Sequence, residues 1–232
     1  MLGPVDWVIW ILSLLFEAAV IVSSVYRKSF RRYFLLNLYM LISVLVSVGT
    51  FRYLLHYGWK SLEYRYFYFY SEALLIIVLY FALISLYLRV FEEMRVERYV
   101  RLGAVLLLAG TACFTYAVVS QSSHRMLTYF VFELCQNLYF VGLVLTYVLW
   151  GAMLKLKETR ALLVQIVLSL GVYFSAYAAS YAISNLRPDL YSYTYRLFPI
   201  IGCLLPLAWA YAIWRVPEDA RLVPSRLAAV PR

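Results

Sequence analysis

Seven long runs of apolar residues constrain this chain more than any other feature of its sequence. Each run is long enough to cross the hydrocarbon core of a bilayer, which takes about 20 helical residues. The runs lack the alternation of a half-buried strand and the single apolar stripe of an amphipathic helix. We therefore predict seven membrane-spanning helices, near residues 4–25, 33–56, 65–90, 100–120, 126–152, 161–184 and 191–214.

Composition points to a membrane protein along the whole chain. Of its 232 residues, 65% are hydrophobic and only 14% are charged, whereas soluble domains average about 45–50% and 25%. Seven spans leave short loops and two ends, too little chain for a soluble catalytic or DNA-binding domain. We expect one all-α integral membrane domain, a seven-transmembrane helix bundle over residues 1–214. Residues 215–232, which contain three prolines, are expected to form a short disordered cytoplasmic tail.

The distribution of Lys and Arg predicts the orientation of the bundle. Fifteen of the 21 basic residues fall in loops and ends that share a side with the C-terminus, and six fall on the opposite side. Basic residues accumulate on the cytoplasmic side of membrane proteins. The N-terminus is therefore expected outside and the C-terminus in the cytoplasm. The same rule accounts for the net charge of +9, so we expect basic loops that face lipid head groups and no nucleic-acid partner.

Motifs of several familiar membrane chemistries are missing. All four lysines lie in predicted loops, which excludes a retinal Schiff base inside the membrane. The histidines, His56 and His124, lie at a predicted membrane edge, where paired haem ligation is not expected. The cysteines at 113, 135 and 203 lie within spans and do not form a disulfide framework. We predict no cofactor and no metal site, and the missing motifs favour a protein that is not an enzyme.

Polar side chains at membrane depth are the candidate functional residues, because ionisable groups there are costly. Glu72 lies about six residues inside the span 65–90, or about 9 Å, and Tyr68 shares its helical face. Glu133 has a similar depth in the span 126–152. Matched depth predicts a ligand-binding cluster of Glu72, Glu133, Arg196, Tyr68, Tyr129, Gln136, Asn137 and Tyr181. The alternative is a polar clamp between helices that only fixes their packing.

Two further groups of polar residues lie within the predicted spans. Glu17 lies near the midplane of the first span, apart from that cluster, and is a candidate proton or polar relay. Its alternative is a neutral carboxyl bonded to a serine or tyrosine of a neighbouring helix. In the span 161–184, polar residues repeat at i, i+4 spacing and are expected to face the interior: Gln165, Ser169, Tyr173, Tyr177, Tyr181 and Asn185.

Several of these segments also resemble segments of other membrane proteins. The stretch 31–34, Arg-Arg-Tyr-Phe, the run Tyr70-Ser71-Glu72-Ala73-Leu74, and Glu133 with Gln136 resemble a family of uncharacterised seven-helix bacterial membrane proteins. The likeness covers nearly the whole chain. It implies a multi-pass protein of the bacterial inner (plasma) membrane and no particular activity. The chain also resembles the seven-helix sensor modules fused to bacterial histidine kinases. Without an effector domain, signalling would require a partner protein.

Three functions from different classes remain open. The first is a receptor-like or sensory module, with an outward-facing pocket for a small amphiphilic or cationic ligand, since ring faces and carboxylates attract cations. The second is a structural or accessory subunit, bound to a membrane protein partner or to further copies of itself. The third is a transporter or ion pathway that uses Glu72 and Glu133 outside and Glu17 deeper. We favour the first, because the inverted repeat typical of transporters is not evident.

Overall fold

A computed structural model describes residues 4–58, 61–92, 97–120, 126–187, 189, 191–217 and 220–221. Within these ranges the description of side chains leaves out residues 4–6, 97–98, 118–119, 126–129 and 191–196. The described secondary structure is helical, with seven helices and no strand: α1 (Pro4–Tyr26), α2 (Phe34–Tyr57), α3 (Leu62–Val90), α4 (Glu97–Ser120), α5 (Met126–Lys155), α6 (Ala161–Leu186) and α7 (Tyr191–Arg215).

All seven helices are long and apolar enough to cross a membrane, which confirms the predicted number of spans. Each predicted range overlaps one helix. Large apolar side chains remain exposed on the outside of the bundle, among them Leu15, Val22 and Leu45. Water-soluble proteins rarely leave such continuous apolar surface uncovered. The chain is therefore a multi-pass helical membrane protein whose outer face suits lipid.

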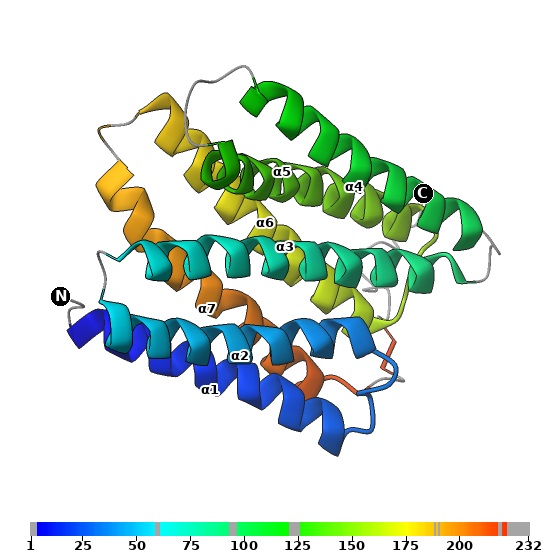
Figure 1. The fold of residues 1–232 in the computed structure, drawn as a ribbon. Helices are drawn as coiled ribbons and strands as arrows, with labels where there is room; N and C mark the ends of the chain where they lie inside the picture. Colours follow the sequence, from blue (N-terminus) through cyan, green and yellow to red (C-terminus); the bar gives the residue numbers. More distant parts are fainter. Residues whose placement is uncertain are drawn as a thin grey trace.

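The helices pack side by side along the bundle, and Figure 1 shows neighbours in sequence lying next to each other. The bundle closes because α7 packs against both α1 and α6, while α3 also packs against α5. The centre is filled by large, fully buried side chains such as Trp209, Phe174 and Leu83. α4 lies at the edge and contacts α5 and α3. Its position is fixed by the Tyr80 hydroxyl, which donates to the Ala104 carbonyl at 2.8 Å.

The start of α3 sets how far along the helix Glu72 lies. Ser61 caps this helix, because its hydroxyl oxygen accepts a hydrogen bond from the backbone N–H of Tyr64 at 3.0 Å. Glu63 in the first turn adds a favourable interaction with the helix dipole. The helix therefore begins at Leu62, three residues before the predicted boundary. Glu72 lies ten residues further on, about 15 Å along the helix axis.

Two helices end in the same way at the opposite end of the bundle. After α1, Lys28 has a φ of 56°, and after α5, Lys157 has a φ of 51°. At the α5 end, Lys157 donates its backbone N–H to the Leu154 carbonyl and Glu158 donates to Met153. This is a Schellman arrangement, in which a left-handed residue, usually glycine, satisfies the last carbonyls. Lysine takes that place here, next to the negative end of the helix dipole.

Arg160 joins several helices at this same end. Its guanidinium makes a two-point contact with Glu158, including a 2.6 Å ion pair, and donates to the Arg89 carbonyl at 3.0 Å. This contact lowers the pKa of Glu158 below its ordinary value. Arg89 lies 4.5 Å from the centroid of the Tyr33 ring. The backbone N–H of Ala161 donates to the Ala220 carbonyl at 3.1 Å, so chain beyond α7 contacts the start of α6.

Candidate functional site

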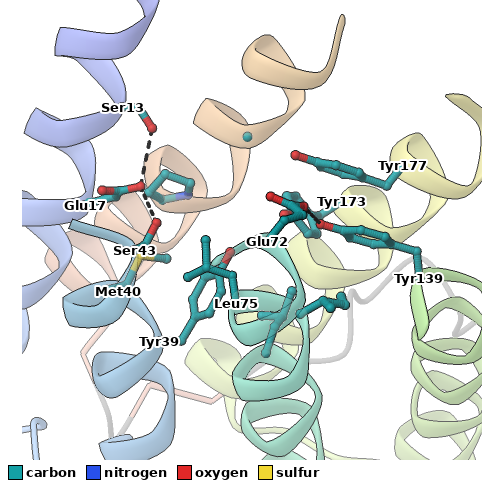
Figure 2. A pocket seen from close by; sticks show the side chains of 14 residues that line it. Ser13, Glu17, Tyr39, Met40, Ser43, Glu72, Leu75, Tyr139, Tyr173 and Tyr177 are labelled. Atoms are coloured by element: carbon teal, nitrogen blue, oxygen red, sulfur yellow. Dashed lines mark hydrogen bonds between the residues drawn. The ribbon is translucent and has the colours of Figure 1, made fainter. Parts of the chain in front are cut away.

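A cavity of about 90 Å³ lies inside the bundle, between every helix except α4. Fourteen described residues line it, most of them polar or aromatic: Ser13, Glu17, Tyr39, Met40, Ser43, Glu72, Leu75, Ile76, Leu79, Tyr139, Tyr173, Tyr177, Gly202 and Pro206. Figure 2 shows the two glutamates on opposite sides of this space. The volume corresponds to about three water molecules at about 30 Å³ each. Small ligand pockets usually enclose about 300–1,000 Å³.

Glu17 forms one side of the cavity together with two serines (Figure 2). Its Oε1 atom accepts hydrogen bonds from the hydroxyls of Ser43 at 2.6 Å and Ser13 at 3.4 Å. The side chain is only 5% exposed. Its second carboxyl oxygen, Oε2, is buried and has no hydrogen-bond partner among the described residues. A buried polar atom in this state is rare and costly, so Oε2 is free to bind a proton, a water molecule or a cation.

Glu72 forms the other side, where tyrosines surround it. The Tyr139 hydroxyl donates to Glu72 Oε1 at 2.7 Å. The Tyr139 ring stacks on Tyr177 with centroids 4.4 Å apart and an interplanar angle of 6°. Tyr173 contacts both rings, at centroid distances of 6.3 and 4.7 Å. In Figure 2 the hydroxyl ends of Tyr139 and Tyr177 point toward Glu72. Stacking fixes the rings and leaves phenol oxygens directed at the carboxyl.

The sequence of α7 provides the remaining wall. Gly202 and Pro206 are one helical turn apart and both line the cavity. Proline has no backbone N–H, so the hydrogen bond from position 206 to the Gly202 carbonyl cannot form. Gly202 also brings the α7 backbone close to α6, since a β-carbon there would lie 3.7 Å from the Tyr177 hydroxyl oxygen. The wall of the cavity therefore includes helical backbone whose carbonyl lacks its usual donor.

The lining of the cavity contains acidic side chains and no basic one among its described residues. It contains two carboxyl groups, and none of the 14 described lining residues is Lys, Arg or His. A carboxylate inside a membrane protein is costly unless it is paired, so each carboxyl needs a proton or a cation from elsewhere. The described residues contain no group of three or more His, Cys, Asp and Glu side chains suited to a metal ion. The polar side chains of the lining offer carboxyl and hydroxyl oxygens, which suit hard cations.

Among the predicted site residues, Glu72 lines the cavity, and so does Glu17, which the sequence analysis treated as separate. Tyr181 is buried beside it, with its ring 5.7 Å from Tyr139 and 5.1 Å from Phe198. Tyr68 is half-buried and its ring lies 6.4 Å from that of Tyr64. Neither Tyr68 nor Tyr181 is among the lining residues.

The predicted residues of α5 point in several directions. Glu133 is half-buried and does not line the cavity. Gln136 is buried, and its Oε1 atom has no hydrogen-bond partner within the described part of the chain. Asn137 turns toward α4, where its amide donates to the Thr115 hydroxyl at 3.0 Å. The predicted residues of α5 are thus divided: Gln136 lies in the interior, whereas Asn137 contacts the edge helix α4.

Two predicted residues lie outside the described side chains. These are Tyr129, in the first turn of α5, and Arg196, near the start of α7. Their helices are described but their side-chain positions are not. The predicted pairing of Arg196 with a carboxyl therefore stays a prediction.

Tyr39, Ser43 and Tyr139 are not among the candidate site residues predicted from the sequence. A signal for Tyr139 was present, because Cys135, Tyr139, Gly142 and Thr146 recur at helical spacing with small residues among them. This pattern indicates the side of α5 that lies closest to a neighbour. Gly142 bears this out, because a β-carbon there would lie 2.4 Å from the Phe174 ring.

Comparison with known proteins finds no matching family model, no matching curated protein and no matching solved structure.

Proposed function

We propose that this protein is a receptor-like or sensory module of the bacterial inner membrane that binds a small cationic ligand against Glu72. In this proposal the N-terminus is outside and the C-terminus is in the cytoplasm. The observation that carries it is the cavity lined by two carboxyls and four tyrosines with no basic residue among its described lining. Any signal would pass to a partner protein or to a second copy of the chain.

The charges favour a cation over an anion. An anion in this cavity would face two carboxyl groups without a compensating positive charge. A cation instead gains from the carboxylate of Glu72 and from the surrounding tyrosines, whose rings and hydroxyl oxygens both attract positive charge. The cost of an unpaired carboxylate at this depth adds to the preference, because a bound cation removes that cost.

The size of the cavity restricts the ligand further. About 90 Å³ accommodates an ion or a few heavy atoms rather than a drug-sized molecule. We therefore propose ammonium or a short alkylammonium ion as the ligand class, and favour it over the larger amphiphile that the sequence also allowed. An ammonium group can donate to Glu72 and to phenol oxygens at the same time.

Thermal unfolding of the purified protein in neutral-lipid nanodiscs tests this proposal. Ammonium, methylammonium and tetramethylammonium chlorides are compared at constant ionic strength and constant sodium concentration. A ligand that binds only the folded state at 100 times its Kd adds about 2.7 kcal/mol of stability, so the unfolding temperature should rise. The rise should be lost in Glu72→Gln.

Glu133→Gln is the matched control, since this glutamate does not line the cavity. It should keep the response to the ligand. If none of the three ions shifts the unfolding of the wild type, the receptor proposal fails. The polar groups would then serve as a helix clamp in an accessory subunit.

A second candidate is a cation or proton pathway, favoured by one observation. Glu17 and Glu72 come from different helices and line the same cavity well inside the bundle, an arrangement that can hand a cation from one carboxyl to the other. Flux of protons or alkylammonium ions into proteoliposomes separates the candidates. Binding without flux supports the receptor, and flux that Glu17→Gln abolishes supports the pathway.

A further inference from the structure

We propose that the Glu17 end of the cavity is a separate binding site for a monovalent alkali cation of sodium or potassium size. The oxygen donors come from two helices: the Glu17 carboxyl and Ser13 hydroxyl of α1, and the Ser43 hydroxyl of α2, all of which line the cavity. This ion is distinct from the ligand proposed at Glu72, so the proposal goes beyond that function and does not depend on it.

The free carboxyl oxygen of Glu17 is the observation that points to an ion. Oε1 already accepts from two serine hydroxyls, whereas Oε2 is buried without a partner among the described residues. At 5% exposure the side chain has almost no access to bulk water. Figure 2 shows Ser13 and Ser43 on either side of this carboxyl, facing the same space. Each serine oxygen keeps lone pairs for a cation while its hydrogen bonds to Oε1.

The charge of the donor set selects a monovalent ion. One carboxylate with hydroxyl oxygens carries a net charge of −1, which an alkali cation neutralises. Calcium sites usually contain several carboxylates, and magnesium demands an octahedral shell with several waters. The Cys203 thiol donates to the Ile9 carbonyl at 3.4 Å. Glu72 remains available to neutralise a second cation.

The test measures unfolding temperature in neutral-lipid nanodiscs while sodium or potassium chloride replaces N-methyl-D-glucamine chloride at constant ionic strength. That organic cation is too large for a 90 Å³ cavity. We expect a saturable rise in the wild type. Glu17→Gln should abolish the rise, and Glu72→Gln should keep it. The ammonium response proposed above should show the reverse pattern, so each proposal can fail alone.

Two further variants keep the test decisive if Glu17→Gln does not fold. Ser43→Ala and Ser13→Ala each remove one hydroxyl ligand beside Glu17, so each should raise the half-saturating salt concentration at least tenfold. The matched substitution away from the cavity is Ser120→Ala in α4. A wild type that shows no saturable rise would overturn the proposal, and so would a rise that persists unchanged in Glu17→Gln, Ser43→Ala or Ser13→Ala.

Discussion

The Tyr139 hydroxyl donates a 2.7 Å hydrogen bond to Oε1 of Glu72, while the Tyr139 ring stacks on Tyr177. The two contacts hold the donor in a fixed direction, because the ring cannot turn without breaking the stack. A hydrogen bond to a half-buried carboxyl is therefore built into the interface between α3, α5 and α6. It stabilises the fold and also sets the position of the proposed ligand group.

Tyr139→Phe should test this contact with little change in shape. The ring and its stack remain, but Glu72 loses its hydroxyl donor. Removing one partner of a buried polar group costs about 1–3 kcal/mol, so the free energy of unfolding should fall by that amount. Tyr177→Phe is the control, because its hydroxyl makes a long, 3.4 Å contact with the Phe198 carbonyl and, among the described contacts, donates no hydrogen bond to Glu72. Chemical unfolding in detergent measures both. Equal losses in the two variants would contradict a specific role for Tyr139.

The close approach of α5 and α6 gives a second prediction. A β-carbon at Gly142 would lie 2.4 Å from Cε1 of Phe174, a side chain with no exposed surface. Gly142→Ala should therefore destabilise the protein by about 1–3 kcal/mol, as in other overpacked cores. Gly110→Ala in α4 is matched, since nothing lies within 4 Å of its β-carbon position. It should be neutral or gain up to about 1 kcal/mol from helix propensity. Comparable unfolding temperatures for both would contradict the packing argument.

The number of helices could be predicted from the sequence, because each helix contains enough consecutive apolar residues to cross a membrane. The site was harder to predict. Glu72 was grouped with Glu133 by depth, but the Glu72 carboxyl accepts a hydrogen bond from Tyr139 and lines the cavity, whereas Glu133 does not line it. Depth says nothing about which way a side chain faces. Glu17 meets Glu72 in one cavity only because α1, α2, α3 and α7 converge there, and such convergence depends on packing between helices far apart in sequence.

Lys157 offers a prediction about the end of α5. Its φ of 51° lies in the left-handed region, where residues with a β-carbon are strained and glycine is not. Lys157→Gly should raise the free energy of unfolding by about 0.5–1 kcal/mol, after the greater freedom of glycine in the unfolded chain is deducted. Lys155→Gly, two residues earlier in the helix, should lower it by a similar amount. Both lysines are exposed, so differences in burial do not confuse the comparison. A loss of stability in both variants would contradict the backbone argument.

The ion pair between Glu158 and Arg160 predicts a dependence on pH. The guanidinium lowers the pKa of Glu158 from its ordinary 4.5, chiefly through the side-chain hydrogen bond. A carboxyl whose pKa is lowered on folding stabilises the folded state at pH values above its ordinary pKa. This stabilisation is lost as the pH falls through the lowered pKa. Glu158→Gln should therefore unfold more easily than the wild type at pH 7, by about 1 kcal/mol or less. The difference should shrink below pH 4.5. A difference that stays constant to pH 3 would show that charge is not its cause.

The orientation of the bundle is the last prediction, and it follows from the excess of basic residues on the side of the C-terminus. Positions 60 and 95 lie outside the described residues, in the connections between α2 and α3 and between α3 and α4. In a variant whose native cysteines are replaced by alanine, a cysteine at Lys60 should react with a membrane-impermeant maleimide in intact cells. A cysteine at Arg95 should react only after the cells are permeabilised. The reverse pattern would place the basic loops outside. The start of α3, which is the end of that helix nearer to Glu72, would then lie on the cytoplasmic side.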